Sequence, residues 1–371
     1  MYLEEQFRFL YSMMKFTGIN SRSPGNNSKR DKLFNHGYRN LLTVVCFVQV
    51  LIGNGTFERV VHRAEQFNVI GLEFFLICQT LTCLLILRNY YLIYSKEHQR
   101  LLAKLGNLCQ LFNCNVSRIR LKTYLSIVLA VVPKLLIVVP YYLVWRDLIA
   151  IFMVLTLIFN TFSITVCVIE STFVIGILGG LFDNLDKEYI DDATRYDYSI
   201  TLLETIDEIN EFYGIVFLLV CVQKLSWITV VVYKYWIYPK EMIFFQGVVM
   251  QQLSRMAWST TFIALLDLVF TCQRTISKAN EAALSTRHFD DYSMKNTKLA
   301  KQINKFLLKN LHQKKKFSAF GFFNIDNSVI YTVFSSIITY LVILIQFKQL
   351  ENDLTHGNSG NETISATGGS T

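Results

Sequence analysis

Charged residues and prolines are both scarce in this sequence. Only 17% of the 371 residues are Asp, Glu, Lys or Arg, whereas about a quarter are charged in an average soluble domain. The four prolines are too few for a β protein rich in loops. The sequence also lacks the segments of about ten residues with alternating polarity that build an outer-membrane barrel. These shortages exclude an ordinary soluble domain and a membrane β-barrel.

Apolar residues, by contrast, make up 52% of the chain and gather in seven runs. The runs are Leu41–Gly53, Val69–Leu87, Tyr124–Val144, Leu148–Phe182, Ile215–Tyr238, Ile243–Thr271 and Ile325–Phe347. Most are at least about 20 residues long, enough for a helix to cross a hydrocarbon core ~30 Å thick. Because lipid offers no hydrogen-bond partners, each run must satisfy its own backbone as a helix. The sequence therefore predicts an all-α membrane protein with seven transmembrane helices over 41–347.

Basic residues set the predicted orientation of these helices. Lys and Arg are concentrated in the N-terminal segment 1–40 and in the connections 88–123 and 272–324, which all lie on one side. The connection 183–214 on the same side is acidic, but Asp and Glu count little in the positive-inside rule. The N-terminus is therefore expected in the cytosol. After seven crossings, the Ser-, Thr- and Gly-rich tail 348–371 is expected outside and disordered.

Several of the cytosolic connections are expected to be helical. The run Leu148–Phe182 is too long for the bilayer and should project below it. Apolar residues at helical spacing in Ser199–Phe212 predict a downward extension of the fifth run. A further helix is predicted at Lys295–His312, which either docks against these extensions or lies on the membrane surface.

Cysteines, histidines and net charge indicate no additional chemistry. None of the eight cysteines lies in a predicted outer loop, so no structural disulfide is expected. The six histidines lack metal-ligand spacing, and no metal or other cofactor is predicted. The net charge of +8 follows membrane topology and does not indicate a nucleic-acid partner. The first 40 residues contain no apolar core, so no cleavable signal peptide is expected.

The last run contains a polar stripe at a period of about 3.5 residues. The stripe consists of Thr332, Ser335, Thr339, Val342, Ile343 and Gln346, with Ser336 beside it. Hydroxyls and an amide are costly against lipid, so this face must meet protein or water. Symmetric copies would enclose a wet pore, with Val342 and Ile343 as a hydrophobic gate and Gln346 at the outer end. The alternative is that these residues only allow close helix packing.

The same run resembles the signature of insect gustatory receptors. The pair Thr339-Tyr340 is followed by five apolar residues and then by the pair Gln346-Phe347, near the end of the chain. The preceding segment Phe317–Asp326 is also similar to that family. Together with the seven runs and the inner N-terminus, the resemblance covers the whole chain.

The resemblance implies a multi-pass receptor in the plasma membrane of sensory neurons, acting in taste perception and signal transduction. It implies a ligand-gated cation channel, either a homotetramer or a heteromer with other gustatory receptors, embedded in membrane lipid. The helix 325–347 would surround the central pore, and each subunit would hold an outward-opening pocket for a small-molecule tastant. Sugar-receptor relatives commonly carry an acidic residue after the Thr-Tyr pair. Leu341 stands there instead, which favours a bitter or deterrent tastant.

Aromatic and amide side chains in the outer halves of runs three, five and six are candidates for that pocket. They are Tyr141, Tyr142, Trp145, Trp227, Tyr233, Trp236, Gln246, Gln251 and Gln252. Aromatic walls with a few amides suit small amphipathic ligands. The alternative is that the Tyr and Trp residues form the aromatic belt at the membrane interface.

Six charged residues lie within the runs, where they should be paired or face water. They are Glu73, Lys134, Glu170, Lys224, Arg255 and Asp267. Glu170 and Asp267 lie near the predicted inner boundary, where solvent can reach them. Asp326, at the start of the last run, is predicted to be a helix N-cap. Asn361 and Asn54 begin glycosylation sequons on the predicted outer side.

Other functions fit the sequence less well. A G-protein-coupled receptor would have an outer N-terminus and characteristic triplets that are absent here. A transporter should show internal repeats, and none is found. An intramembrane enzyme should show a motif such as His-Glu-x-x-His, which is also missing. An odorant-receptor-type channel of the related insect family remains as the alternative.

Overall fold

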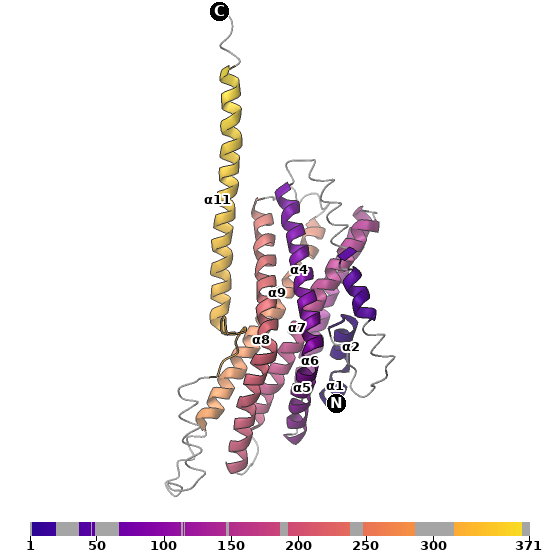
Figure 1. Ribbon diagram of the computed structural model, residues 1–371, viewed down its shortest axis with the longest axis vertical. Helices are drawn as coiled ribbons and strands as arrows, with labels where there is room; N and C mark the ends of the chain where they lie inside the picture. The colour runs from indigo at the N-terminus through magenta and orange to yellow at the C-terminus, as the bar shows by residue number, and fades with distance from the viewer. Residues whose placement is uncertain are drawn as a thin grey trace, which may run out of the picture.

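The computed structural model describes residues 2–19, 37–45, 47–48, 67–112, 114, 116–145, 148–185, 192–237, 248–285 and 315–365. Within these ranges the chain is helical except for turns and one short hairpin. The helices are α1 (Tyr2–Gln6), α2 (Arg8–Phe16), α4 (Phe67–Ile93), α5 (Ser95–Leu111), α6 (Ser117–Trp145), α7 (Leu148–Leu185), α8 (Asp192–Ile237), α9 (Val248–Ser285) and α11 (Asn327–Ser365) (Figure 1).

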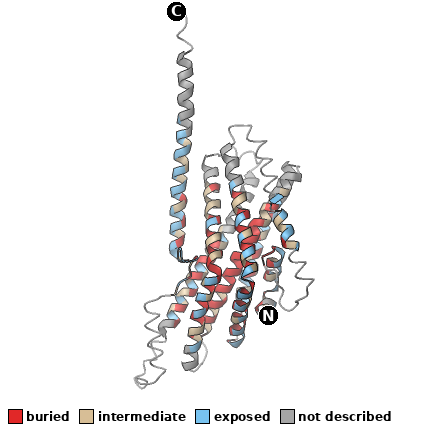
Figure 2. Ribbon diagram, viewed as in Figure 1, coloured by how far each residue is buried: buried red, intermediate tan, exposed pale blue. Residues whose placement is uncertain are grey.

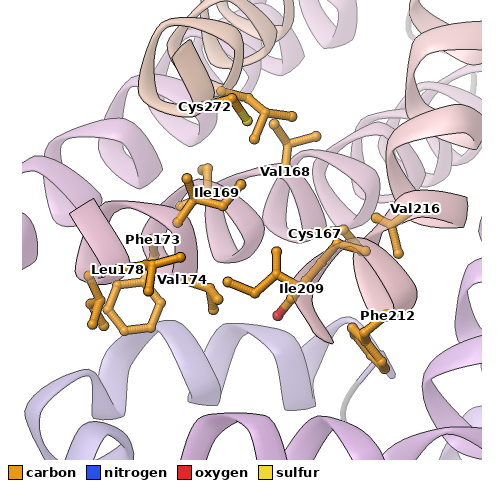
Figure 3. Packing of buried hydrophobic residues seen from close by; sticks show 14 of the residues in the cluster. Cys167, Val168, Ile169, Phe173, Val174, Leu178, Ile209, Phe212, Val216 and Cys272 are labelled. Carbon is orange, nitrogen blue, oxygen red and sulfur yellow. The ribbon is translucent and has the colours of Figure 1, made fainter. Parts of the chain in front are cut away.

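Helix α7 forms the centre of the bundle because it is apolar on every side. From Phe162 to Leu185 nearly all of its residues are buried, as expected of a helix without a polar face. It packs against α4, α6, α8 and α9 and against the shorter α2 and α5. Figure 2 shows this buried material through the middle of the bundle. In the close-up, side chains of α7, α8 and α9 meet in one apolar core (Figure 3).

The N-terminal helices are part of this core. Leu3, Phe7, Leu10 and Met14 recur at helical spacing and are fully buried. The ring of Phe7 lies 4.0 Å from that of Phe173 on α7, measured between centroids. The sequence analysis treated this segment as polar and missed the stripe, because only one residue in three or four is apolar and buried.

Four of the described helices are long and apolar enough to cross a membrane. These spans are Phe75–Ile93, Leu155–Leu185, Asp197–Val230 and Asn327–Leu350. Six of the seven predicted runs lie within α4, α6, α7, α8, α9 and α11, apart from a few residues at their ends. The first run is described only at 41–45 and 47–48, which are helical. The count of seven crossings and the sides of the two termini stay predictions.

The predicted extension of the fifth run is confirmed. Helix α8 runs without interruption from Asp192 to Ile237, and Leu202, Ile206 and Ile209 are buried in the core. The predicted helix at Lys295–His312 lies outside the described residues.

Helix α11 begins where the sequence predicts and ends later. Asp326 accepts a hydrogen bond from the backbone N–H of Ser328 at 2.9 Å and another from its hydroxyl, which confirms the predicted N-cap. The helix continues to Ser365, so the prediction of a disordered tail from 348 is wrong up to that residue. Adding residues to an existing helix costs far less than nucleating one, which explains how a polar tail can extend α11.

A short hairpin, Phe317–Ile325, connects to the start of α11. The backbone N–H of Ile325 donates to Phe317 O at 2.8 Å, and that of Ala319 donates to Phe323 O at 2.9 Å. Phe320 and Gly321 form its turn with φ of 51° and 80°, the left-handed geometry of a type I′ turn. A Cβ built on Gly214 of α8 would lie 3.0 Å from the Phe320 nitrogen, so the hairpin and α8 are in close contact.

The side chain of Asn210 on α8 holds the hairpin in place. Its Nδ2 donates to Lys316 O at 2.8 Å, and its Oδ1 accepts from the Ser318 N–H at 3.0 Å. The amide thus forms two hydrogen bonds to the hairpin strand, much as a neighbouring strand would. The start of α11 is thereby attached to α8.

Asn210→Ala should loosen this attachment. The substitution removes both hydrogen bonds, and we expect a loss of about 1–3 kcal/mol of stability, seen as a lower melting temperature of the purified protein in detergent. Asn210→Asp keeps the acceptor for Ser318 and should lose less. Equal melting temperatures for wild type and Asn210→Ala would show that the clamp is not needed for stability.

Candidate functional site

Helix α11 packs against the rest of the bundle through one narrow stripe. Val329, Val333 and Ile337 are buried and contact Leu225 and Ile228 of α8. These three residues are four apart, so they lie on one face of the helix. In Figure 1, α11 stands at the edge of the bundle and continues beyond the upper ends of the other helices.

The predicted polar stripe lies on roughly the opposite face of α11. Thr332, Ser335, Thr339 and Gln346 are all exposed on the single chain. At about 100° per residue, their positions centre on the side away from Val333 and Ile337. The Thr339 hydroxyl donates to Ser335 O at 2.9 Å and that of Thr332 to Ser328 O at 3.1 Å. Both hydroxyl protons are thus used within the helix, leaving oxygen lone pairs facing outward.

The apolar members of the stripe and the other motif residues are exposed as well. Val342 is 48% and Ile343 40% exposed. Tyr340 and Phe347, which complete the family motif, are also exposed large side chains. A helix of this apolar character with only one packed stripe presents its remaining surface to lipid or to another chain.

Only one of the nine predicted pocket residues has a described side chain. The indole N–H of Trp227 donates to the Thr80 hydroxyl of α4 at 2.9 Å, so Trp227 ties α8 to α4. The others lie outside the described residues or on helix segments whose side chains are not described. They are Tyr141, Tyr142, Trp145, Tyr233, Trp236, Gln246, Gln251 and Gln252. Their part in a pocket stays a prediction, as do the sequons at Asn361 and Asn54.

A groove runs along the contact between α4 and α8. Its volume is about 340 Å³. Phe75, Cys78, Gln79, Thr82, Cys83, Ile86, Leu219, Val222 and Gln223 line it. A row of polar contacts accompanies it: Gln79 donates to the Ser226 hydroxyl at 2.8 Å, and Gln223 donates to that of Thr80 at 3.4 Å. Sequence reasoning missed this groove because neither helix has a regular polar face there.

A buried polar network surrounds Glu170 of α7. Its Oε2 accepts from the Tyr91 hydroxyl at 2.9 Å, and its Oε1 accepts from Tyr213. His98 Nε2 lies 2.8 Å from the same Oε1, and the His98 ring stacks on Phe212 at 4.9 Å between centroids. Four helices, α4, α5, α7 and α8, are tied together at this one carboxylate.

The surroundings of Glu170 correct the sequence analysis. Glu170 was expected to be solvated near the inner boundary, but it is 0% exposed and hydrogen-bonded on both oxygens. A helix position alone could not show this, because the donors come from three other helices. Asp267 behaves as expected, since it pairs with Lys122 at 2.6 Å. Lys134 does not, since it is buried with no hydrogen-bond partner for its Nζ.

Metal chemistry and disulfides find no support in the part of the chain that the structure describes. No group of three or more His, Cys, Asp or Glu there could hold a metal ion. All seven cysteines described are free thiols.

A family model decides where the chain belongs. The model of the 7tm chemosensory receptors matches residues 7–351, which is nearly the whole sequence. The chain belongs to the 7tm chemosensory receptor family. It is therefore a multi-pass membrane receptor and not an enzyme.

The relatives of this chemosensory receptor include gustatory receptors of Drosophila melanogaster, as the motif in α11 predicted. "Gustatory and pheromone receptor 39a, isoform A" is 39% identical over 100 residues, which is 27% of this chain and 26% of the relative. Isoform C is 32% identical over 152 residues, 39% of this chain and 36% of the relative. "Gustatory receptor 68a" is 60% identical over 50 residues, 14% of this chain and 13% of the relative. These matches span well under two thirds of each relative.

Solved structures show the same fold. The insect olfactory receptor OR5 from Machilis hrabei superposes with a TM-score of 0.65 at 11% identity, over 93% of this chain and 98% of the other. The same protein in complex with eugenol gives a TM-score of 0.55 over the same shares. At this identity the likeness concerns the fold of the chemosensory receptor alone.

Glu170→Ala should strongly destabilise the receptor. The substitution leaves Tyr91, Tyr213 and His98 buried without their common acceptor, which we expect to cost about 3 kcal/mol or more. Glu170→Gln keeps one oxygen acceptor and should cost less. Thermal unfolding of the detergent-purified protein measures the order of the variants.

A surface pair provides the control. Glu208 binds Lys104 at 2.7 Å and is partly exposed, so Glu208→Ala should cost no more than about 1 kcal/mol. If Glu170→Ala unfolded no earlier than Glu208→Ala, the network would not be the tie between helices described above.

Proposed function

We propose that this receptor is a subunit of a ligand-gated cation channel whose pore is lined by α11. The observation that carries the proposal is the arrangement of α11, with an apolar stripe packed on α8 and a polar stripe on roughly the opposite face. A polar face in a membrane-spanning helix needs water or protein beside it. Copies of the chain around a central axis, as a homotetramer or with related receptors, would supply both.

In such an assembly the stripe contains the parts of a gate. Val342 and Ile343 would form a hydrophobic constriction that closes the pore by excluding water. Gln346, one turn further along, would place a ring of amides at the outer mouth. Thr332, Ser335 and Thr339 would offer hydroxyl oxygens to passing cations below the constriction.

The stimulus proposed for this channel is a small-molecule tastant. The gustatory relatives support a role in taste, and Leu341 after the Thr-Tyr pair favours a bitter or deterrent compound over a sugar. The likeness to a solved olfactory receptor supports a second candidate, an odorant-receptor-type subunit. The two differ in the ligand and in the sensory neuron whose plasma membrane holds the protein, with the same arrangement of α11.

Cysteine cross-linking can test whether the polar stripe faces other subunits. Thr339→Cys places a thiol on the exposed stripe, so mild oxidation should yield disulfide-linked dimers of the full-length receptor in membranes. Ile337→Cys is the matched control, because position 337 is packed against the bundle of its own chain. Wild type reports any linkage through native cysteines. Equal cross-linking at both positions, or none at 339, would contradict a shared axis lined by the stripe.

Substitutions in the proposed gate should change currents in a predictable direction. Val342→Ser and Ile343→Ser make the constriction wettable, so we expect basal current to rise several-fold in cells that express the receptor. Gln346→Ala should alter relative cation permeability while leaving surface expression unchanged. The measurement is whole-cell recording across a panel of bitter compounds and sugars.

Ile338→Ser is the control for these recordings. Ile338 is exposed on α11 but lies beside the stripe, not within it, so its polar variant should leave permeation as in wild type. Ligand-evoked currents that are the same in wild type and in the variants at 342, 343 and 346 would rule out this pore assignment.

A further inference from the structure

Two buried lysines face each other inside the bundle. Lys134 of α6 is 2% exposed and Lys224 of α8 is 3% exposed. Their ammonium groups are close enough to repel one another, and Nζ of Lys134 has no hydrogen-bond partner. Burying one ammonium without a counter-charge costs several kcal/mol, and a second one nearby adds to that cost. Such an arrangement calls for a negative charge.

The described acids do not supply that charge. Glu170 is occupied by two tyrosines and His98, and Asp267 by Lys122. On α8 the nearest acid below Lys224 is Glu211, about 20 Å further along the helix. Glu73 of α4, whose side chain is not described, lies about two turns above Thr80. That threonine is level with Gln223 because the two side chains are hydrogen-bonded.

The lysines also lie too deep for a lipid headgroup to reach them. Lys134 is about 16 Å along α6 from its end at Trp145, and Lys224 about 20 Å along α8 from its end at Ile237. Both are therefore near the middle of a ~30 Å hydrocarbon core. A counter-charge at this depth has to arrive on a molecule that carries its own apolar body.

The groove between α4 and α8 provides a route for such a molecule. Its lining includes Cys83 and Gln223. Lys224 follows Gln223 in the sequence and lies close enough to the Cys83 thiol to interact with it electrostatically. Most of the remaining lining is apolar, and the groove extends along α4 from Phe75 to Ile86, about 16 Å. A medium-length alkyl chain fits a volume of 340 Å³.

We propose that the receptor binds an amphipathic carboxylate, with its chain in the α4–α8 groove and its carboxylate directed at Lys224 and Lys134. This inference rests on the proposed function, because it names the chemical class of ligand that the receptor takes. A single carboxylate neutralises the repulsion between the two ammonium groups and gives Lys134 an acceptor. A cationic amphiphile of the same size is rejected by like charge.

The site also has a path to the proposed pore helix. Val222 and Gln223 line the groove, and Leu225 and Ile228 on the next turn of α8 contact α11. A ligand that draws Lys224 toward its carboxylate acts on the same segment of α8. Occupancy of the groove therefore bears on the helix that holds α11.

The test is direct binding to the full-length receptor in nanodiscs of neutral phosphatidylcholine. Labelled decanoate is the probe, and decan-1-ol competes as the uncharged molecule of equal chain length. We expect decanoate to bind at least tenfold tighter than decan-1-ol. Lys134→Met and Lys224→Met should each weaken decanoate binding at least tenfold and leave the alcohol unchanged. Decanoate that binds no better than decan-1-ol, or as well to both variants as to wild type, overturns the proposal.

Two further variants locate the site. Lys122→Met removes a lysine of the same helix α6 that already has a partner, so decanoate binding should stay as in wild type. Val222→Trp fills the groove and should weaken decanoate and decan-1-ol alike. Unchanged binding in Val222→Trp would overturn the placement in the groove.

Folding and channel activity are read separately. Removing an uncompensated buried charge does not cost stability, so Lys134→Met and Lys224→Met should melt no lower than wild type without ligand. Lower melting would show that the lysines have counter-charges within the protein, which overturns the proposal. Binding needs no conductance, so decanoate that binds lysine-dependently without evoking current supports the site and counts against the channel.

Discussion

A helix without a polar face has to be enclosed, and α7 imposes that requirement on this receptor. Helices α4, α6, α8 and α9 surround it, and the short α2 and α5 cover what remains. The one acid in its buried stretch, Glu170, is accommodated because hydrogen-bonding groups from three neighbouring helices meet it. The arrangement of the lower half of the bundle thus follows from the need to cover one helix and to satisfy one carboxylate.

Helix α8 connects the functional parts of the molecule. One face lines the groove with α4, another packs on α11, and Asn210 on its lower half holds the hairpin that leads into α11. Each of these contacts uses a different few turns of the same uninterrupted helix. A change in the environment of one turn is therefore transmitted along a continuous hydrogen-bonded rod to the start of the proposed pore helix.

The sequence predicted the elements that repeat locally and missed those that depend on distant partners. The apolar runs, the extension at Ser199–Phe212 and the cap at Asp326 follow from spacing and local hydrogen bonding, and the structure contains them. The burial of Glu170 and the groove depend on which helices become neighbours, information that no single run contains. Tyr91 and Tyr213 look like ordinary aromatic residues until α7 brings a carboxylate between them. The role of the polar stripe depends on further copies of the chain, so neither sequence nor a single chain decides it.

The contact at Gly214 fixes the geometry of α11 more tightly than any side chain does. A methyl group there would meet the backbone nitrogen and Cα of Phe320 at 3.0 and 3.2 Å, and backbone atoms cannot rotate aside. Relief would require the hairpin to shift, and the root of a 39-residue helix would shift with it. Such a helix is about 58 Å long, so it acts as a lever arm on which a small tilt at the root becomes a displacement of several ångströms at the far end. The hydrogen atom of one glycine thus sets the aim of the longest exposed helix in the receptor.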